Sequence, residues 1–331
     1  MTSLTQAHQS DFPDNLTMVA VPASDHVSGL NLTELARYLG ECTGALIQFK
    51  TCASYDEAIK ALSDGTAQLG WLGPHSFAEA AHGGNIEAFA IGVPKGKNNP
   101  NYRSLFIAHP DGQVKHIGDV KNTRIAIGDQ HSTSGYIVPR QILEDNGIHL
   151  DNDSEFKEII HAGNHDEAIR MVCQGHADVA AVSSVNLEEN IQNGTLSKSD
   201  VRVIYRSQDI SGGPLVCSTT LSAPARARLK ALVLDAHNHI EVGGYGGAME
   251  RYIDPSEGRA KLLETYLKPQ WGWRTQVVLS GFVTLTGLVM ADMDVDLLDL
   301  LKNSTNYLVD VVGRMMPPDF SNLGTLLRAM V

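Results

Sequence analysis

The sequence predicts an α/β protein built from two similar lobes, and three observations predict this. Short apolar runs alternate with helix-like segments along residues 16–205. A stretch that begins at Tyr55 recurs at His165, at an offset of about 110 residues. A hydroxyl-rich turn, residues 129–136 (DQHSTSGY), stands between a predicted strand and a predicted helix. Ligands of open α/β sheets bind beyond the carboxyl ends of strands, so we expect a site between the lobes.

The first lobe is predicted from strands and helices that follow one another in turn. Its helices each precede a further apolar run, as expected for a mostly parallel sheet with helical crossovers. Asn31 and Glu34 have the spacing of a capping box at the start of the first helix. Strands are expected at residues 16–22, 45–49, 68–72 and 89–93, and helices at 31–39, 56–62 and from 77 to 81.

The second lobe repeats this order between two segments expected to cross between the lobes, 104–108 and 201–205. Strands are expected at 123–127, 158–160 and 179–182, and helices at 136–143, 166–173 and 187–191. Residues 221–267 are expected to be helical around a glycine-rich break, and to pack back on the first lobe. The predicted limits are 1–105 with 205–270 for lobe 1, 106–204 for lobe 2, and 271–331 for a helical tail.

The internal repeat indicates which residues face each other across the cleft. Residues 55–70 (YDEAIKALSDGTAQLG) match residues 165–180 (HDEAIRMVCQGHADVA), each as a helix, a glycine and a buried strand. Tyr55 therefore pairs with His165 at a helix start. Residues 73–75 (GPH) pair with residues 183–185 (SSV) at the end of a strand.

The turn at residues 129–136 is suited to a small tetrahedral anion. Free backbone N–H groups and the helix dipole favour negative charge at a helix start. Ser132, Thr133 and Ser134 add hydroxyl donors, and Gly135 allows a ligand to approach the backbone. The alternative is ordinary helix capping, for which one hydroxyl group would suffice.

Composition limits the partners. The 331 residues carry a formal net charge of −12, and no basic stripe is present to neutralise nucleic-acid phosphates, so we expect no nucleic-acid partner. A small anion held by neutral donors remains compatible with an acidic surface. We expect no cofactor and no metal ion. The cysteines, Cys42, Cys52, Cys173 and Cys217, lack metal-ligand spacing, and Cys42 with Cys52 are either free thiols or a bridge.

Residues of about 16–267 resemble the phosphonate-, phosphite- and phosphate-binding proteins of ABC transporters. The motifs are Gly73-Pro74 with an aromatic at Phe77, residues 131–136 (HSTSGY), 165–168 (HDEA) and 177–182 (ADVAAV). The resemblance implies a two-lobed, type II-like periplasmic-binding-protein fold with a hinge and no catalytic activity. It also implies a ligand site, in which the serine–threonine turn and His165 hold the oxyanion and Tyr55 closes over it. The expected ligand-binding residues are Tyr55, Gly73, Pro74, His75, Phe77, Ser132, Thr133, Ser134, Gly135, His165 and Ser183.

Two departures from that family concern the ligand. Phe77 stands where the family often has tyrosine, and Ser183 where it often has an acid. An aminoalkylphosphonate would lose a counter-charge at Ser183, so phosphite, phosphate or methylphosphonate is expected. The resemblance further implies the permease and ATPase subunits of an importer as partners. It implies a periplasmic location, or one on the outer face of a membrane. No signal peptide is present in residues 1–14, so we expect an exported domain whose start is truncated.

The tail resembles a different protein of the same transporters. Residues of about 272–331 are similar to the N-terminal part of the permease subunit, through residues 296–301 (DLLDLL) and 316–323 (MPPDFSNL). Residues 277–291 are apolar but short for a full membrane span of roughly 20 residues. Either a weak transmembrane helix, giving contact with a membrane, or an amphipathic partner helix is compatible with this run.

Two other functions remain open. Ser132 or Ser134, with His165 and Asp166, could form the triad of a serine-dependent hydrolase. The G-x-S-x-G elbow of such enzymes is absent from the sequence, and we expect no enzyme activity. A membrane-tethered interaction protein is the second alternative, and it depends only on the tail. Thermal stabilisation by phosphite or a phosphonate would support the binding function. Turnover of ester substrates would support the hydrolase.

Overall fold

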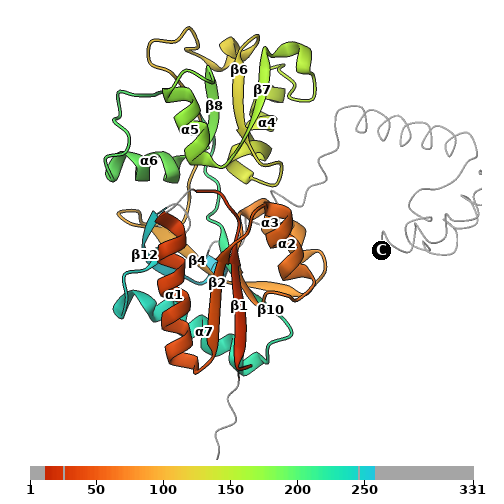
Figure 1. The fold of residues 1–331 in the computed structure, drawn as a ribbon, viewed down its shortest axis with the longest axis vertical. Helices are drawn as coiled ribbons and strands as arrows, with labels where there is room; N and C mark the ends of the chain where they lie inside the picture. The colour runs from red at the N-terminus through yellow and green to blue at the C-terminus, as the bar shows by residue number, and fades with distance from the viewer. Residues whose placement is uncertain (1–11, 25–26, 245–246, 258–331) are drawn as a thin grey trace, which may run out of the picture. The chain divides into compact units, whose positions relative to one another are not determined.

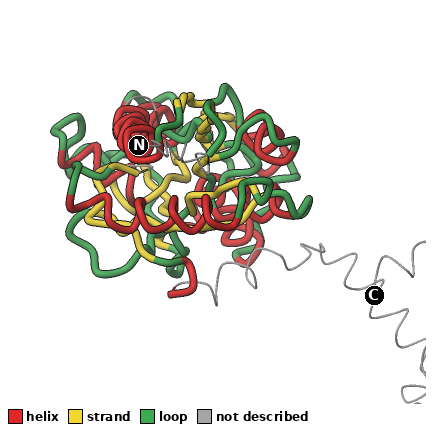
Figure 2. The backbone as a smooth tube through the Cα atoms, turned by 90° about the horizontal axis from the view of Figure 1, so that it is seen from below, coloured by secondary structure: helices red, strands yellow, loops and turns green. Residues whose placement is uncertain are grey.

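The computed structural model describes residues 12–24, 27–244 and 247–257. Their strands form two sheets, one in each of two lobes, with helices on the faces of both (Figure 1). The tube in Figure 2, seen from below, shows helices flanking the strands on more than one side. The expected two-lobed α/β architecture is therefore confirmed.

The larger sheet contains seven described strands in the order β11-β12-β4-β10-β3-β1-β2. β1 pairs in parallel with β2 and β3, whereas β10 and β12 run antiparallel to their neighbours. The bounds are β1 Asn15–Ala20, β2 Leu46–Thr51, β3 Leu69–Trp71, β4 Ile86–Pro94, β10 Pro214–Ser218, β11 Gly243–Gly244 and β12 Gly247–Ile253.

Both faces of this sheet are covered, because successive side chains of a strand point to opposite sides. Leu16 and Met18 of β1 pack with helices α1 (Val27–Thr43) and α7 (Ala223–Asp235). Val19 lies in a second core with α2 (Tyr55–Ser63) and α3 (Pro74–Ala81) on the other face. The near-continuous apolar run of β1 follows from this burial on two sides.

The smaller sheet contains five described strands in the order β7-β6-β8-β5-β9. Ile125 and Ile127 of β6 pack on the side of α4, and Ala126 packs on the side of α5 and α6. The bounds are β5 Ser104–Ala108, β6 Arg124–Gly128, β7 Glu158–Gly163, β8 Val179–Ser183, β9 Arg202–Arg206, α4 Val138–Asp145, α5 His165–Cys173 and α6 Ser184–Gln192. The short helices are η1 Ile117–Val120, the π-helical turn η2 Thr133–Ile137, η3 Asp153–Glu155, η4 Ala236–Asn238 and η5 Pro255–Glu257.

Two segments connect the lobes, residues 95–103 before β5 and residues 207–213 after β9. They pair with each other, because the N–H of Tyr102 donates to the carbonyl of Ile210 at 2.9 Å and the reverse bond measures 2.7 Å. The segments expected to cross, 104–108 and 201–205, instead lie mainly within paired strands of the smaller sheet. The domain limits drawn there from the sequence stay a prediction.

The two copies of the internal repeat form nine-residue helices that begin and end at equivalent positions. Each helix has a side-chain cap at the residue before it. Ser54 accepts a hydrogen bond from the N–H of Glu57 before α2, and Asn164 accepts one from Glu167 before α5. Glycines with positive φ follow both helices, Gly65 at 81° and Gly175 at 71°. The repeated sequence therefore encodes the same helix, turn and buried strand in each lobe.

The expectation for residues 221–267 is wrong. Residues 221–267 were expected to be helical, but after α7 and η4 the chain forms β11 and β12, and β12 pairs with β4. The glycines of this segment suit close packing against Met249, where a Cβ at Gly244 would meet its side chain at 2.6 Å. The expected helix at 258–267 and the tail at 271–331 lie outside the described residues.

Within the described ranges, no helix is long and apolar enough to cross a membrane. The apolar run at 277–291 falls outside those ranges, so its two interpretations stay predictions. All four cysteines are free thiols, and Cys42 and Cys52 are not bridged.

Candidate functional site

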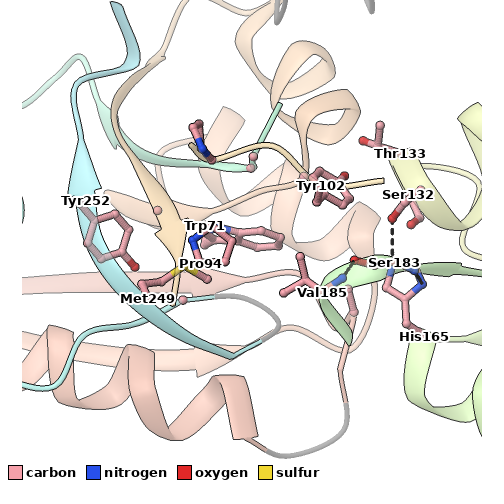
Figure 3. Close-up of a pocket in the computed structure, with 18 of the residues that line it drawn as sticks. Trp71, Pro94, Tyr102, Ser132, Thr133, His165, Ser183, Val185, Met249 and Tyr252 are labelled. Atoms are coloured by element: carbon pink, nitrogen blue, oxygen red, sulfur yellow. Dashed lines mark hydrogen bonds between the residues drawn. The ribbon is translucent and has the colours of Figure 1, made fainter. Parts of the chain in front are cut away.

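A cavity of about 50 Å³ lies between the lobes, where strand ends and the η2 turn converge. Figure 3 shows Ser132, Thr133 and His165 on one side of it and Trp71, Met249 and Tyr252 on the other. The lining residues are Ala23, Tyr55, Trp71, Gly73, Gly92, Pro94, Pro100, Tyr102, Ser132, Thr133, Ser134, His165, Ser183, Val185, Gly212, Gly213, Gly244, Met249 and Tyr252.

The η2 turn places three buried hydroxyl groups at one end of this cavity. Ser132, Thr133 and Ser134 are 4%, 2% and 2% exposed. The Ser132 hydroxyl caps the turn by accepting from the N–H of Gly135 at 3.1 Å. The first N–H groups of such a turn have no intrahelical carbonyl to bond, so those of Thr133 and Ser134 are available to an anion.

The turn is fixed from two directions. The Ser104 hydroxyl of β5 donates to the carbonyl of Ser134 at 2.8 Å. Gly135 packs so closely that an added Cβ would lie 3.1 Å from Gly128 Cα and 3.1 Å from His165 Cε1. Gly135 is therefore needed for packing behind the turn, and it does not itself line the cavity.

His165, at the start of α5, is 4% exposed and lies beside the turn. Its Nδ1 accepts a hydrogen bond from the N–H of Ser183 at 3.3 Å, and its Nε2 lies 3.3 Å from the Ser134 hydroxyl oxygen. Burial lowers the pKa of His165 to about 4. The ring is therefore neutral at pH 7, with its proton on Nε2, where it can donate to Ser134 or to a ligand oxygen.

Two tyrosines approach the same end of the cavity from the other side. Tyr55, on α2, is buried, and its burial raises the pKa of its hydroxyl well above its usual range. Burial likewise raises the pKa of Tyr102 to about 12. The Tyr55 hydroxyl interacts with Ser132, and that of Tyr102 interacts with Ser134 and Thr133. Both phenols remain protonated and can donate hydrogen bonds.

The other end of the cavity is apolar. Trp71 at the end of β3 lies there with Pro94, Met249 and Tyr252, and Val185 lies between Trp71 and Ser183 (Figure 3). In the part of the chain that the structure describes, no Asp, Glu, Lys or Arg lines the cavity. The described lining therefore combines neutral hydrogen-bond donors at one end with an apolar wall at the other, and it contains no formally charged side chain.

Contacts between the lobes close the cavity. The N–H of His75 donates to the Thr133 hydroxyl oxygen at 2.9 Å, and the N–H of His165 donates to the carbonyl of Ala23 at 3.2 Å. The Ser24 hydroxyl donates to Asp166 at 2.7 Å. Thr133 thus accepts from the opposite lobe while its own proton can point to a ligand.

The structure brings together seven of the residues proposed from the sequence: Tyr55, Gly73, Ser132, Thr133, Ser134, His165 and Ser183. Pro74, His75, Phe77 and Gly135 do not line the cavity. Phe77 packs in the core with Tyr55 instead, and Pro74 starts α3. Ser183 caps α6 by accepting from the N–H of Val185 at 3.2 Å.

Sequence reasoning missed Tyr102, Trp71, Met249 and Tyr252. Trp71 lies in the run 68–72 that the sequence predicts as a buried strand, and the only signal of its position at the cavity is the Gly73-Pro74 motif that follows. Met249 and Tyr252 belong to the segment expected to be helical. Tyr102 lies in a connecting segment, whose position no local pattern predicts.

A cluster of possible metal ligands lies near the turn. Each of His75, Glu79 and His131 offers one ligand atom, and these atoms lie within 4.8 Å of one another. His75 and Glu79 belong to α3, whereas His131 directly precedes the hydroxyl turn of the other lobe.

Residues 18–261 match the protein family described as the periplasmic substrate-binding protein of phosphonate ABC transporters. The chain is 27% identical over 180 residues to the phosphonates-binding periplasmic protein of Escherichia coli, covering 53% of this chain and 52% of that protein. It is 24% identical over 110 residues to a probable ABC transporter phosphite-binding protein of Prochlorococcus marinus, covering 31% and 37%. The chain thus matches about half or less of the length of these curated relatives.

Solved structures share the fold. The structure of PhnD1 from Prochlorococcus marinus in complex with methylphosphonate has a TM-score of 0.64 and 18% identity, covering 78% of this chain and 100% of that one. A binding-protein component of a phosphonate ABC transporter from Pseudomonas aeruginosa has the same TM-score and identity, covering 85% and 98%. At such low identity these likenesses establish the fold alone.

Proposed function

This chain belongs to the periplasmic substrate-binding family of phosphonate ABC transporters, and we propose that it captures a small phosphorus oxyanion between its lobes. The ligand is phosphite, phosphate or methylphosphonate. The observation that carries this proposal is the convergence of the three η2 hydroxyl groups and His165 Nε2 at one end of the cavity. Hydrogen bonds to an ionised group are roughly twice as strong as neutral ones, so this cluster favours an oxyanion.

Neutral donors are sufficient for such a ligand. The dipole and free N–H groups of a helix start stabilise negative charge without a cationic side chain. His165 contributes as a neutral donor, because burial lowers its pKa to about 4. Tyr55 and Tyr102 add phenolic donors from the opposite side. The arrangement explains how a chain with a net charge of −12 can hold an anion.

The size and lining of the cavity favour a ligand with few atoms. A cavity of about 50 Å³ exceeds several-fold the roughly 10–15 Å³ that one water needs in such a space, so it has room for a ligand of a few non-hydrogen atoms. Among the described residues no carboxylate lines the cavity, so within this lining the amine of 2-aminoethylphosphonate would be buried without a counter-charge. The apolar wall formed by Trp71 and Met249 suits a methyl group better than an ammonium group.

The geometry does not favour the hydrolase alternative. A serine hydrolase needs a histidine whose Nδ1–H donates to an acid, leaving Nε2 free to accept the serine proton. Here Nδ1 of His165 accepts from the N–H of Ser183, which leaves the proton on Nε2. Asp166, the proposed acid, instead accepts from Ser24 and Asn190. We therefore propose a binding protein without catalytic activity.

The partners follow from this function. A substrate-binding protein of an ABC importer delivers its ligand to the permease and ATPase subunits, and it works in the periplasm, where the ligand is captured. The permease-like tail and its membrane contact carry none of this argument, because they lie outside the described residues.

A ligand screen tests the proposal. Thermal unfolding of the full chain is followed with phosphite, phosphate, methylphosphonate, 2-aminoethylphosphonate and sulfate, and hits are titrated by calorimetry. A ligand that binds only the folded state at 100 times its Kd stabilises it by about 2.7 kcal/mol. We expect at least one of the first three ligands to raise the melting temperature most. If 2-aminoethylphosphonate binds tightest, the assignment of the ligand class is wrong.

A further inference from the structure

Three side chains from both lobes meet beside the cleft, outside the cavity described above. His75 and Glu79 lie one turn apart on α3, where residues i and i+4 share a face. His75 Nε2 lies 3.3 Å from Glu79 Oε1. His131 of the other lobe places its Nδ1 2.6 Å from Glu79 Oε2. In sequence His131 is 52 residues from Glu79, which is why no local motif predicts the cluster.

The ring of His131 lies between two carboxylates and the amide of Gln130. Its Nδ1 faces Glu79, and its Nε2 lies 2.9 Å from Asp56 Oδ1 and 3.1 Å from Gln130 Nε2. A neutral imidazole donates through only one nitrogen. If Nε2–H donates to Asp56, the lone pair of Nδ1 points at the carboxylate of Glu79, and a cation between them would satisfy both.

The partners of the other two residues fit the same conclusion. His75 is largely buried, and among the described residues its Nδ1 has no hydrogen-bond partner. Its Nε2 is directed to Glu79 at 3.3 Å. Glu79 is 35% exposed, whereas the two imidazoles are 17% and 15% exposed, so an ion could enter past the carboxylate.

We propose that His75, Glu79 and His131 bind a divalent transition-metal ion, with Zn²⁺ the best match, and that the ion bridges the two lobes. Two imidazoles and one carboxylate are a known zinc donor set, whereas Mg²⁺ and Ca²⁺ prefer oxygen ligands alone. Bonds of about 2.1 Å in tetrahedral geometry separate ligand atoms by about 3.4 Å. The 3.3 Å separation of His75 and Glu79 already matches this value, and the 2.6 Å separation needs only a small side-chain rotation.

Asp56 completes the site as an orienting residue. Metal-binding histidines commonly donate their other ring N–H to a carboxylate, which fixes the tautomer. Asp56 lies at that place beside Nε2 of His131, and a proton on Nε2 directed to it leaves Nδ1 as the ligand atom. The carboxylates of Asp56 and Glu79 also supply two negative charges next to a dication.

The site is linked to the oxyanion turn through the chain. His131 directly precedes Ser132, and the N–H of His75 donates to the Thr133 hydroxyl oxygen at 2.9 Å. An ion held by α3 and His131 would therefore favour the closed arrangement of the lobes. Coupling between two sites is reciprocal, so Zn²⁺ and the oxyanion would each raise the affinity of the other by the same factor.

Zinc titration of the full chain tests the site without any oxyanion, so its result is independent of the proposed function. After chelator treatment, calorimetry with ZnCl₂ should give one site per chain that MgCl₂ and CaCl₂ do not occupy. His131→Ala and Glu79→Gln should each weaken that site about a hundredfold or more, and Asp56→Asn by about 10–100-fold. His176→Ala, which removes an exposed histidine after α5, is the matched control and should bind as the wild type does.

Two results would overturn the proposal: no stoichiometric Zn²⁺ binding by the wild type, or wild-type affinity in His131→Ala. Diffraction data collected from the wild type at the zinc absorption edge locate the ion directly, so this measurement does not depend on whether a variant folds. An ion bound elsewhere would also overturn the proposal. Equal Zn²⁺ affinity with and without a bound oxyanion would contradict the bridging of the lobes.

Discussion

The backbone N–H of Ser183 donates to Nδ1 of His165 at 3.3 Å, and this bond determines what the imidazole can do. It assigns the ring proton to Nε2, which faces the Ser134 hydroxyl at 3.3 Å. A buried, neutral donor of this kind binds an anion without the cost of burying a cation. The sequence alone pairs His165 with Tyr55 through the repeat, but the tautomer follows only from the position of β8.

The first prediction is that His165 makes stability depend on pH. The folded state keeps the ring neutral to about pH 4, whereas an unfolded histidine protonates near pH 6.5. The unfolded chain therefore binds more protons between these values. The contribution of His165 is fully present above pH 6.5 and is lost as pH falls toward 4, by of order 3 kcal/mol.

Urea unfolding of wild type and His165→Gln at pH 7.5, 6 and 5 measures this loss. Other histidines contribute equally to both proteins, so the difference between the two profiles isolates His165. The wild type should lose stability more steeply than the variant as the pH is lowered. Parallel profiles would show that His165 takes up its proton as readily in the folded protein as in the unfolded chain.

The second prediction concerns Glu189 on α6. Burial, together with the charge of Asp166, raises its pKa to about 7. The folded state then holds a proton that the unfolded state releases above its ordinary value of 4.5. Glu189 therefore destabilises the fold progressively as pH rises from 4.5 to about 7.

Glu189→Gln should raise the free energy of unfolding relative to wild type at pH 8 and leave it nearly equal at pH 4. Chemical denaturation at the two pH values measures this. The matched control is Glu188→Gln, which removes the adjacent carboxylate that pairs with Lys97 at 3.1 Å. An equal gain in the free energy of unfolding at pH 4 and pH 8 would mean that the gain does not come from the proton on Glu189.

The third prediction is that ligand binding protects one particular amide. The N–H of His165 is at the first turn of α5 and has no intrahelical partner, so among the described residues the carbonyl of Ala23 in the other lobe protects it. Opening about the paired segments near Tyr102 and Ile210 would break this bond. Hydrogen exchange at His165 should therefore slow on addition of saturating methylphosphonate.

The amide of Gly44, which donates to the carbonyl of Gly40 within lobe 1, is the internal control and should exchange at an unchanged rate. If exchange at His165 is equally slow without ligand, the lobes do not open and the site is rigid.

The fourth prediction concerns Trp71, which forms the apolar wall. Trp71→Ala enlarges that end of the cavity while the hydroxyl turn stays in place. Each additional buried CH₂ contributes about 0.8 kcal/mol, so two of them correspond to about tenfold in affinity. The ratio of propylphosphonate to methylphosphonate affinity should therefore rise about tenfold in the variant. Calorimetry of both ligands on both proteins measures the ratio, and an unchanged ratio would place the organic group elsewhere.

Local patterns predicted most of the fold because its elements are regular. Buried strands such as β1 and β8 are mostly apolar runs, and the repeat marks α2 and α5 with the glycines that follow them. Strand β12 was missed, because its pairing with β4 depends on a partner more than 150 residues earlier in the chain. Tertiary pairing, rather than a local pattern, decides the conformation of these residues.

The polar end of the site could be predicted from one short turn and its repeat partner. Ser132, Thr133 and Ser134 are adjacent in sequence, and His165 is at the repeat position of Tyr55. The apolar wall and the cluster around Glu79 could not be predicted, because Met249 and His131 meet their neighbours only after the chain has passed through both lobes.

Binding calorimetry on the hydroxyl turn tests the central claim most directly. Ser132→Ala, Thr133→Val and Ser134→Ala together remove three donors, each worth roughly 1.5–3 kcal/mol to an ionised ligand. The affinity for the tightest of phosphite, phosphate and methylphosphonate should fall by at least about three orders of magnitude. Ser222→Ala, which removes the N-cap of α7 that accepts from Ala225 at 3.2 Å, controls for the loss of a cap and should bind normally. Unchanged affinity in the triple variant would contradict the assignment of the oxyanion site to this turn.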